Sequence, residues 1–235
     1  MSNIDSSPGS SAKRCRKSDR DVFHAYMVKG AEFEGAFDMP KLDPVKVEAK
    51  GLIAFLDAMS AKAADENKFV HFFVDDWRFE RFWNNPYKYL EKLKRYAGVI
   101  EPDFSTCSNF PEALKIWNTY RNRSCSRWLQ DNGVIVVPNI RVEPDNADYS
   151  LAGIPRRSTV AIGANGCVKN RANRRRFSHS LKYAVDKLLT SNIIVYGSDA
   201  YDVFEYPKSR GIPISFHTEG IRGNYGDDAD ERKVL

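Results

Sequence analysis

Short, continuous runs of apolar residues recur through the middle of the chain, and most of them stop abruptly at polar side chains. Five such runs lie at residues 69–74, 98–100, 134–137, 159–162 and 193–196. Buried parallel strands have sequences of this kind, because helices cover both faces of their sheet. The pattern therefore predicts parallel strands here. A last strand is expected at 212–216, where Pro213 favours an edge position, and a short apolar segment lies at 52–55.

Segments with a helical spacing of apolar residues separate these runs. One helix is predicted to begin at Pro86, capped by Asn85, and the longest to begin at a capping box formed by Asn109 and Glu112. A third helix is expected to be capped near Asn173. Short helices are predicted at 57–64 and 199–206, whereas residues 142–157 show no helical periodicity.

This alternation of strand and helix predicts an α/β fold with a mostly parallel sheet of about six or seven strands and flanking helices. Two layouts are compatible with it. An incomplete TIM-like barrel suits the polar strand ends, because a barrel uses the ends of all its strands. The predicted core is shorter than the ~250 residues of a standard barrel, however. We therefore favour an open, doubly wound sheet, which binds ligands near the point where its strand order reverses.

Composition divides the chain of 235 residues into three parts. Residues 1–21 are rich in Ser and then in basic residues, and they predict a disordered arm. Residues 22–219 predict a single α/β domain, and residues 220–235, rich in Gly and Asp, a disordered tail. No apolar run approaches the ~20 residues that cross a membrane, so no membrane partner is expected. Four scattered cysteines and the absence of a signal sequence indicate a cytoplasmic protein.

The formal net charge of +5 and the isoelectric point near 8.9 make the chain mildly basic. This charge is compatible with nucleic acid or a phosphorylated ligand as partner, but the positions of the charges carry more information.

Three aspartates follow the first two of the polar-ended strands. Asp75 and Asp76 end one run, and Asp103 follows the next. Neighbouring parallel strands are ~5 Å apart, so all three carboxylates are candidate catalytic residues acting on one ligand. Clustered oxygen ligands suit Mg²⁺ or Mn²⁺, for which Asp75 and Asp103 are the candidate metal ligands. The structural alternative is that Asp76 caps a helix beginning at Trp77 and that Asp103 forms a turn.

Asn139 and Arg141 follow the next strand, two residues apart, so we expect them to face the same way. The planar guanidinium of Arg141 suits a carboxylate or a phosphate, and Arg141 is the fourth candidate catalytic residue. The alternative is an ion pair between Arg141 and one of the aspartates, which neutralises the cluster without a metal ion.

Residues 163–176 combine glycines with cations and give the strongest anion-binding signal. Glycines let backbone N–H groups approach a ligand, and a helix N-terminus favours negative charge. Cations near the N-terminus of a helix are repelled by the helix dipole, so their presence here favours a bound anion. The alternative is a basic loop that is exposed to solvent. The spacing is not that of a P-loop. The candidates for binding phosphate or nucleic acid are Asn139, Gly163, Asn165, Gly166, Lys169, Arg171, Arg174, Arg175 and Arg176.

Several of these stretches resemble a domain-of-unknown-function family whose members occur in bacterial phages, plasmids and integrative elements. The similarity extends over about residues 30–215, and the stretches that carry it are 72–76, 79–81, 83–86, 102–105, 116–123, 138–141 and 163–167. The resemblance implies a bacterial host cytoplasm containing mobile DNA. It assigns no catalytic residue, and it favours roles in DNA replication, DNA transfer, nucleotide metabolism or counter-defence.

The function predicted from these features is that of an enzyme acting on a nucleotide or nucleic-acid phosphate at the carboxyl ends of the strands. A non-catalytic DNA- or RNA-binding accessory protein is the second hypothesis. A counter-defence protein that binds a host factor is the third. The sequence gives no indication of the oligomeric state.

Overall fold

The computed structural model describes residues 21–141 and 147–220. Its parallel strands are β3 (Gly51–Ala54), β4 (Lys68–His71), β5 (Gly98–Ile100), β6 (Val136–Val137), β7 (Thr159–Gly163), β8 (Asn192–Tyr196) and β9 (Ile214–His217). Its helices are η1 (Ala25–Val28), α1 (Phe55–Ser60), α2 (Asp76–Asn84), α3 (Tyr87–Leu93), α4 (Glu112–Asp131), α5 (Ala147–Ser150), α6 (Arg171–Leu188) and α7 (Glu205–Ser209). A short antiparallel pair that the sequence pattern does not reveal, β1 (Phe33–Glu34) and β2 (Met39–Pro40), lies between η1 and β3.

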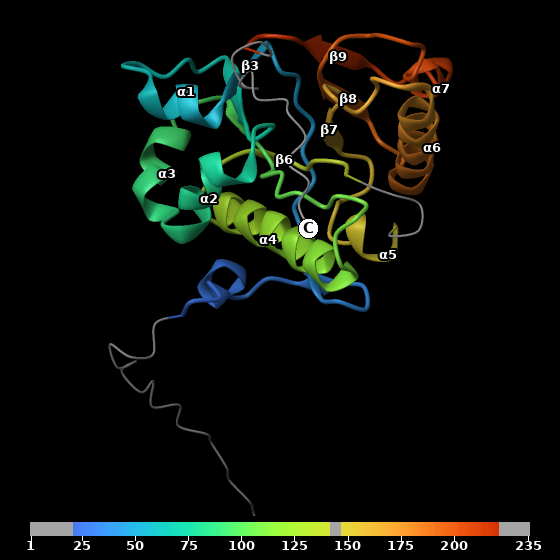
Figure 1. Ribbon diagram of the computed structural model, residues 1–235. Coiled ribbons are helices and arrows are strands. Elements are labelled where there is room, and N and C mark those ends of the chain that lie inside the picture. Colours follow the sequence, from blue (N-terminus) through green and yellow to red (C-terminus); the bar gives the residue numbers. More distant parts are fainter. Residues whose placement is uncertain (1–20, 142–146, 221–235) are drawn as a thin grey trace, which may run out of the picture.

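The parallel strands form two sheets whose strand order follows the chain (Figure 1). One sheet has the order β3-β4-β5-β6, and the other has the order β7-β8-β9. A parallel bridge between Asn139 and Ala161 continues the pairing from β6 to β7. Strands β3 and β9 pair on one side only, so the described strands do not close into a barrel. The prediction of an α/β fold with mostly parallel strands is confirmed, as is the edge position of the last strand.

Both faces of each sheet are covered, which explains the continuous apolar runs. Val136 packs with helices α1 to α4, whereas its neighbour Val137 faces the other sheet. In the same way Val195 packs against α6, while Ile194 points inward. The inner faces of both sheets therefore share one cluster, made of Leu52, Phe69, Phe73, Ile100, Val137, Ala161, Ile194 and Tyr196. In Figure 1, α1 to α3 lie beside the larger sheet, and α6 and α7 lie at the other end, beside the smaller sheet.

A buried ion pair joins the longest helix to the strand ends. Arg123 of α4 lies 2.5 Å from Glu101, and both side chains are almost fully buried. Arg123 also donates to the backbone carbonyls of Ser150 and Ala152, at 2.7 and 3.0 Å. Glu101 accepts the backbone N–H of Asn139 at 2.8 Å. The pair thus connects α4 and α5 to the ends of β5 and β6.

The beginnings of two helices differ from the sequence prediction. The longest helix begins at Glu112 with Pro111 at its N-cap, so the predicted capping box with Asn109 is not formed. Pro86 is the N-cap of α3 rather than its first residue, and Asn85 is the C-cap of α2. The prediction was wrong there because α2 extends to Asn84, directly before the expected start of the next helix. Asn85 therefore lies at the C-terminus of α2.

Three further boundaries differ because of local backbone bonding. The first polar-ended strand stops at His71, since the backbone N–H of Phe73 binds His71 Nδ1 at 3.2 Å instead of continuing the ladder. The cap of α6 is Asn170, whose side chain accepts the backbone N–H of Asn173 at 2.8 Å. The predicted helix at 199–206 lies instead at Glu205–Ser209.

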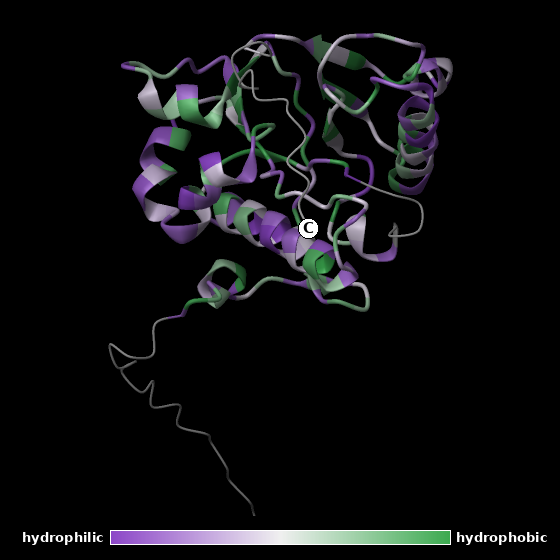
Figure 2. Ribbon diagram, viewed as in Figure 1, coloured by the Kyte–Doolittle hydropathy of each residue, from purple (hydrophilic) through white to green (hydrophobic). Residues whose placement is uncertain are grey.

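The predicted link at 142–157 contains the short helix α5, whose four residues are too few to show helical periodicity. Figure 2 shows that α6, by contrast, alternates between hydrophilic and hydrophobic positions along its length. No helix in the described part of the chain is long and apolar enough to cross a membrane. Apart from Asp21 and Gly220, the predicted arm (1–21) and tail (220–235) lie outside the described residues.

Candidate functional site

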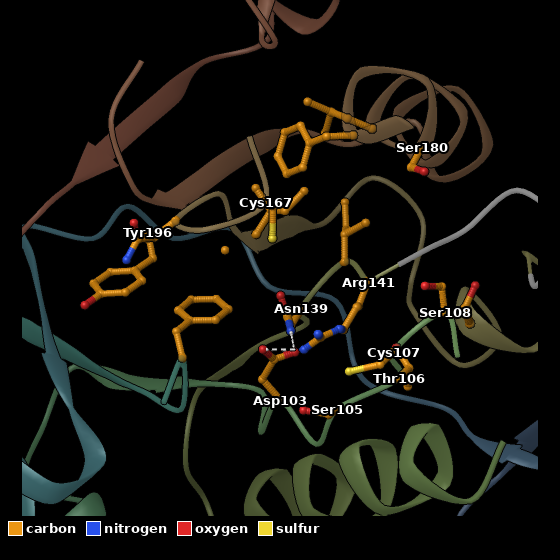
Figure 3. A pocket seen from close by; sticks show the side chains of 18 of the residues that line it. Asp103, Ser105, Thr106, Cys107, Ser108, Asn139, Arg141, Cys167, Ser180 and Tyr196 are labelled. Carbon is orange, nitrogen blue, oxygen red and sulfur yellow. Dashed lines mark hydrogen bonds and ion pairs between the residues drawn. The ribbon is translucent and has the colours of Figure 1, made fainter. Parts of the chain in front are cut away.

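A pocket of about 420 Å³ opens at the carboxyl ends of β4 to β8 (Figure 3). Parallel pairing brings the residues that follow successive strands to the same edge. The candidate residues that line the pocket are Asp75, Asp103, Asn139, Arg141, Gly163, Asn165 and Arg176. The candidates Asp76, Gly166, Lys169, Arg171, Arg174 and Arg175 do not line it.

The centre of the pocket is an ion pair between Asp103 and Arg141. Arg141 Nη1 lies 2.7 Å from Asp103 Oδ2, and Asn139 Nδ2 donates to Asp103 Oδ1 at 2.8 Å. In Figure 3 the side chains of Asn139 and Arg141 both point toward this carboxylate. The Asp103 side chain is 15% exposed and that of Arg141 is 39% exposed. The ion pair named as the alternative in the sequence analysis is therefore formed.

The electrostatics of this pair follow from burial and charge. Burial raises the pKa of Asp103 above its ordinary value, and the positive charge of Arg141 opposes that rise. The negative charge of Asp103 in turn raises the pKa of Arg141, so the guanidinium stays protonated at every relevant pH.

Asp76 is turned toward a serine of the pocket wall. Its carboxylate accepts the backbone N–H of Ser105 at 3.0 Å and the Ser105 hydroxyl at 3.0 Å. Burial raises the pKa of Asp76, although the hydrogen bonds from Ser105 lower it. Asp76 is the first residue of α2, and the N-cap position belongs to Asp75, whose side chain makes no capping hydrogen bond. Asp76 therefore does not cap a helix that begins at Trp77; it holds the loop that carries Ser105.

The other two acids near the strand ends have separate partners. Asp75 Oδ2 lies 3.5 Å from Nε of Arg78 on the next turn of α2. Glu101 follows the end of β5 at Ile100 and pairs with the buried Arg123 of α4.

Among the described residues there is no group of three or more His, Cys, Asp or Glu that could hold a metal ion. Each of the two expected metal ligands faces an arginine instead: Asp75 faces Arg78, and Asp103 faces Arg141. Binding of Mg²⁺ or Mn²⁺ at this site stays a prediction.

Two buried polar atoms of the pocket wall have no hydrogen-bond partner among the residues that the structure describes. Asn139 is 5% exposed, and its Oδ1 accepts no hydrogen bond, although its Nδ2 is used by Asp103. Ser150 is also 5% exposed, and its hydroxyl is unpaired. Buried polar atoms normally have partners, so these two atoms are candidate contacts for a ligand or a water molecule.

The basic segment at 163–176 is divided between two places. Gly163, Asn165 and Arg176 line the strand-end pocket. The cations at 171, 174 and 175 face a second, open hollow on the same helix. Helical geometry explains the division, because residues at 171, 174 and 175 share one side of α6.

Several pocket residues were not selected from the sequence. Ser105 lacks a recognisable nucleophile motif, and only the fold shows its bond to Asp76. Tyr196 lines the pocket and is the last residue of β8, so the end of that predicted strand could have indicated it as a pocket residue. Cys107 and Cys167 also line the pocket, and burial raises the pKa of the Cys167 thiol. In Figure 3 they come from different strand-end loops.

Comparison with known proteins finds similarity to proteins of two phages. The family model described as "Domain of unknown function (DUF4417)" matches residues 31–210. The "Gene 1 protein" of Mycobacterium phage L5 is 32% identical over 185 residues, which cover 75% of this chain and 81% of that protein. The "Gene 1 protein" of Mycobacterium phage D29 is 31% identical over 181 residues, covering 73% and 67% of the two chains. No solved structure matches. The resemblance inferred from the sequence is thus confirmed, and the chain belongs to the DUF4417 family.

Proposed function

We propose that this protein is an enzyme that binds the phosphate of a nucleotide or nucleic acid in the strand-end pocket and acts on it there. Arg141 is the observation that carries the proposal. A guanidinium has five N–H donors in a planar fork that matches a phosphate. Asp103 occupies one end of that fork, and the remaining donors of Arg141 bind no other described residue. The side chain lines the pocket and is 39% exposed, so a ligand can reach it.

The remainder of the pocket fits the other parts of a nucleotide. The unpaired Oδ1 of Asn139 needs a donor, which a sugar hydroxyl or a base amino group supplies. Phe73 and Tyr196 stack at 5.4 Å and give the wall an aromatic section. A volume of about 420 Å³ lies within the range of small-molecule sites.

Asp76 and Ser105 are the groups to which we assign proton transfer. The Ser105 hydroxyl lines the pocket and donates to Asp76 Oδ1 at 3.0 Å. Because burial raises the pKa of Asp76, its carboxylate is a stronger base than an exposed aspartate. The pair is suited to accept a proton from a nucleophile in the pocket, while Arg141 stabilises negative charge on the phosphate.

Isothermal titration calorimetry against nucleoside mono-, di- and triphosphates tests the binding step. We expect at least one nucleotide to bind, and Arg141→Ala to weaken its binding about tenfold or more, since a charged hydrogen bond is lost. Arg95→Ala is the matched control, because Arg95 is exposed and precedes β5 at the opposite end of the sheet. Absence of binding by the unmodified protein, or equal binding by Arg141→Ala, contradicts the proposal. Chromatography of the nucleotide after incubation then separates an enzyme from a non-catalytic binder.

A further inference from the structure

The side of α6 that carries Arg171, Arg174 and Arg175 forms a second polar surface. These three arginines line an open hollow together with Tyr201. Arg176, one residue further along the helix, lines the strand-end pocket. Arg175 of the hollow and Arg176 of the pocket are consecutive residues of α6, so the two places adjoin on the helix surface and one extended ligand can contact both.

Among the described residues, no acidic side chain pairs with the cations of this surface. Arg171, Arg174 and Arg175 form no ion pair with any residue of 21–141 or 147–220, and the first turn of α6 contains no acidic residue. On either side of Tyr201 and Asp202 in the sequence, Asp199 and Glu205 pair with Lys208, at 2.7 and 3.1 Å. Asp202 is the remaining acid beside Tyr201. Cations near a helix N-terminus are also repelled by the helix dipole, so a bound anion relieves two unfavourable interactions.

An exposed aromatic ring lies among these cations. Tyr201 is 58% exposed, and the Arg174 guanidinium carbon lies 4.1 Å from its ring centroid. The backbone of Tyr201 and Asp202 is left-handed, with φ values of 64° and 55°, which non-glycine residues seldom adopt. The loop therefore holds a tyrosine outward beside three arginines.

We propose that Arg171, Arg174, Arg175 and Tyr201 bind single-stranded nucleic acid, whose chain continues along α6 into the strand-end pocket. Arginines contact phosphates, and an exposed ring stacks on a base, which is how proteins bind single strands without reading their sequence. A duplex keeps its bases stacked on each other and cannot use Tyr201 in this way. The inference rests on the proposed function and narrows it, because the phosphate in the pocket then belongs to a strand rather than to a free nucleotide.

Fluorescence anisotropy with labelled 12-nucleotide oligothymidylate and oligouridylate tests this surface in the full chain. We expect Tyr201→Ala to weaken binding about fivefold or more, as expected when a stacked base loses its ring. Tyr201→Phe keeps the ring and keeps the affinity. The double variant R174A/R175A weakens binding further and reduces its dependence on salt, since fewer phosphate contacts are made. A duplex of the same length binds at least fivefold more weakly than the single strand.

Asp202→Asn is the matched control, since asparagine also accepts left-handed backbone and only a negative charge is removed. Its oligonucleotide affinity should equal or exceed that of the unmodified protein. Unchanged affinity in Tyr201→Ala and R174A/R175A, no binding of either oligonucleotide, or equal binding of the duplex overturns the inference. Calorimetry with mononucleotides separates the two proposals. The surface variants should bind mononucleotides as the unmodified protein does. Absence of mononucleotide binding in the unmodified protein, or equal binding by Arg141→Ala, counts against the pocket.

Discussion

The carboxylate of Asp103 lies 2.7 Å from the guanidinium of Arg141, and Asn139 donates a second hydrogen bond to that carboxylate at 2.8 Å. Asp103 is therefore held on both sides, and we expect it to orient Arg141 rather than to act as a free base. Partly exposed ion pairs contribute at most about 1 kcal/mol to stability. We therefore expect this ion pair to orient the N–H donors of Arg141 and to contribute little to the free energy of unfolding.

Asp103→Asn should weaken nucleotide binding about tenfold, because Arg141 loses the charge that orients it. The melting temperature should fall by no more than about 4 °C, as expected for a loss of about 1 kcal/mol in a domain of this size. Calorimetry and a thermal melt measure the two effects. Asp131→Asn, which removes a carboxylate from a surface pair with Arg127, is the control and should leave binding unchanged. Equal affinity of Asp103→Asn and the unmodified protein contradicts the orienting role.

Asp76→Asn should slow turnover of the bound nucleotide about 100-fold or more while leaving its affinity nearly unchanged. The asparagine Oδ1 still accepts the Ser105 hydroxyl and, at 3.3 Å, its backbone N–H, so the loop keeps its place, but the side chain no longer accepts a proton. Single-turnover measurements with saturating nucleotide give the rate of the chemical step. Ser105→Ala should have a similar effect, and the double variant should be no slower than either single variant, because the two residues act together. If the rate losses of the two single variants multiply in the double variant, Asp76 and Ser105 do not act together.

The strand pattern was predictable because each strand is buried on two sides. Val136 and Val137 show this, since one faces the helices and the other faces the inner cluster. Cap positions were less predictable, since several residues near each helix start are able to cap. Asn173 has the side chain of a good cap, yet it donates its backbone N–H to Asn170 instead.

Partners within the site depend on three-dimensional distance, which sequence order does not give. The sequence predicted that Asp103, Asn139 and Arg141 lie close together, and all three line one pocket. That prediction needed only the direction of the strands, because the carboxyl ends of parallel strands meet at one edge of the sheet. The bond from Ser105 to Asp76 spans 29 residues, and no local pattern indicates it. The division of the basic segment follows from the boundaries of α6, which the sequence placed only approximately.

Glu101→Gln should destabilise the fold by about 3–5 kcal/mol, because it leaves the charge of Arg123 buried without its partner. Urea unfolding followed by circular dichroism measures the loss. The unfolding slope should stay the same, since the native state remains compact. Glu32→Gln, at an exposed pair with Lys41, serves as control and should leave the unfolding midpoint unchanged. A small effect of Glu101→Gln indicates that water reaches Arg123.

His71 should make the stability of the protein depend on pH. The side chain is fully buried, its ring centroid lies 4.2 Å from that of Tyr196, and burial lowers its pKa to about 3. The unfolded chain protonates His71 near pH 6.5, whereas the folded protein does not protonate it until about pH 3. Between these values the unfolded state binds more protons, so the free energy of unfolding falls as the pH falls. The stabilisation is complete above about pH 6.5 and decreases toward pH 3.

From pH 7 to pH 5 this residue should therefore account for a loss of about 2 kcal/mol in the free energy of unfolding. Asp76, Glu101 and Asp103 act in the opposite direction, because burial raises the pKa of each, so the comparison must isolate His71. Urea unfolding of His71→Gln at both pH values does so, since the variant keeps all other titrating groups. The variant will be less stable at pH 7, yet it should lose less stability between pH 7 and pH 5 than the unmodified protein. Parallel losses in both proteins show that His71 is protonated in the folded state, and that the interior between the two sheets is less dry than its packing indicates.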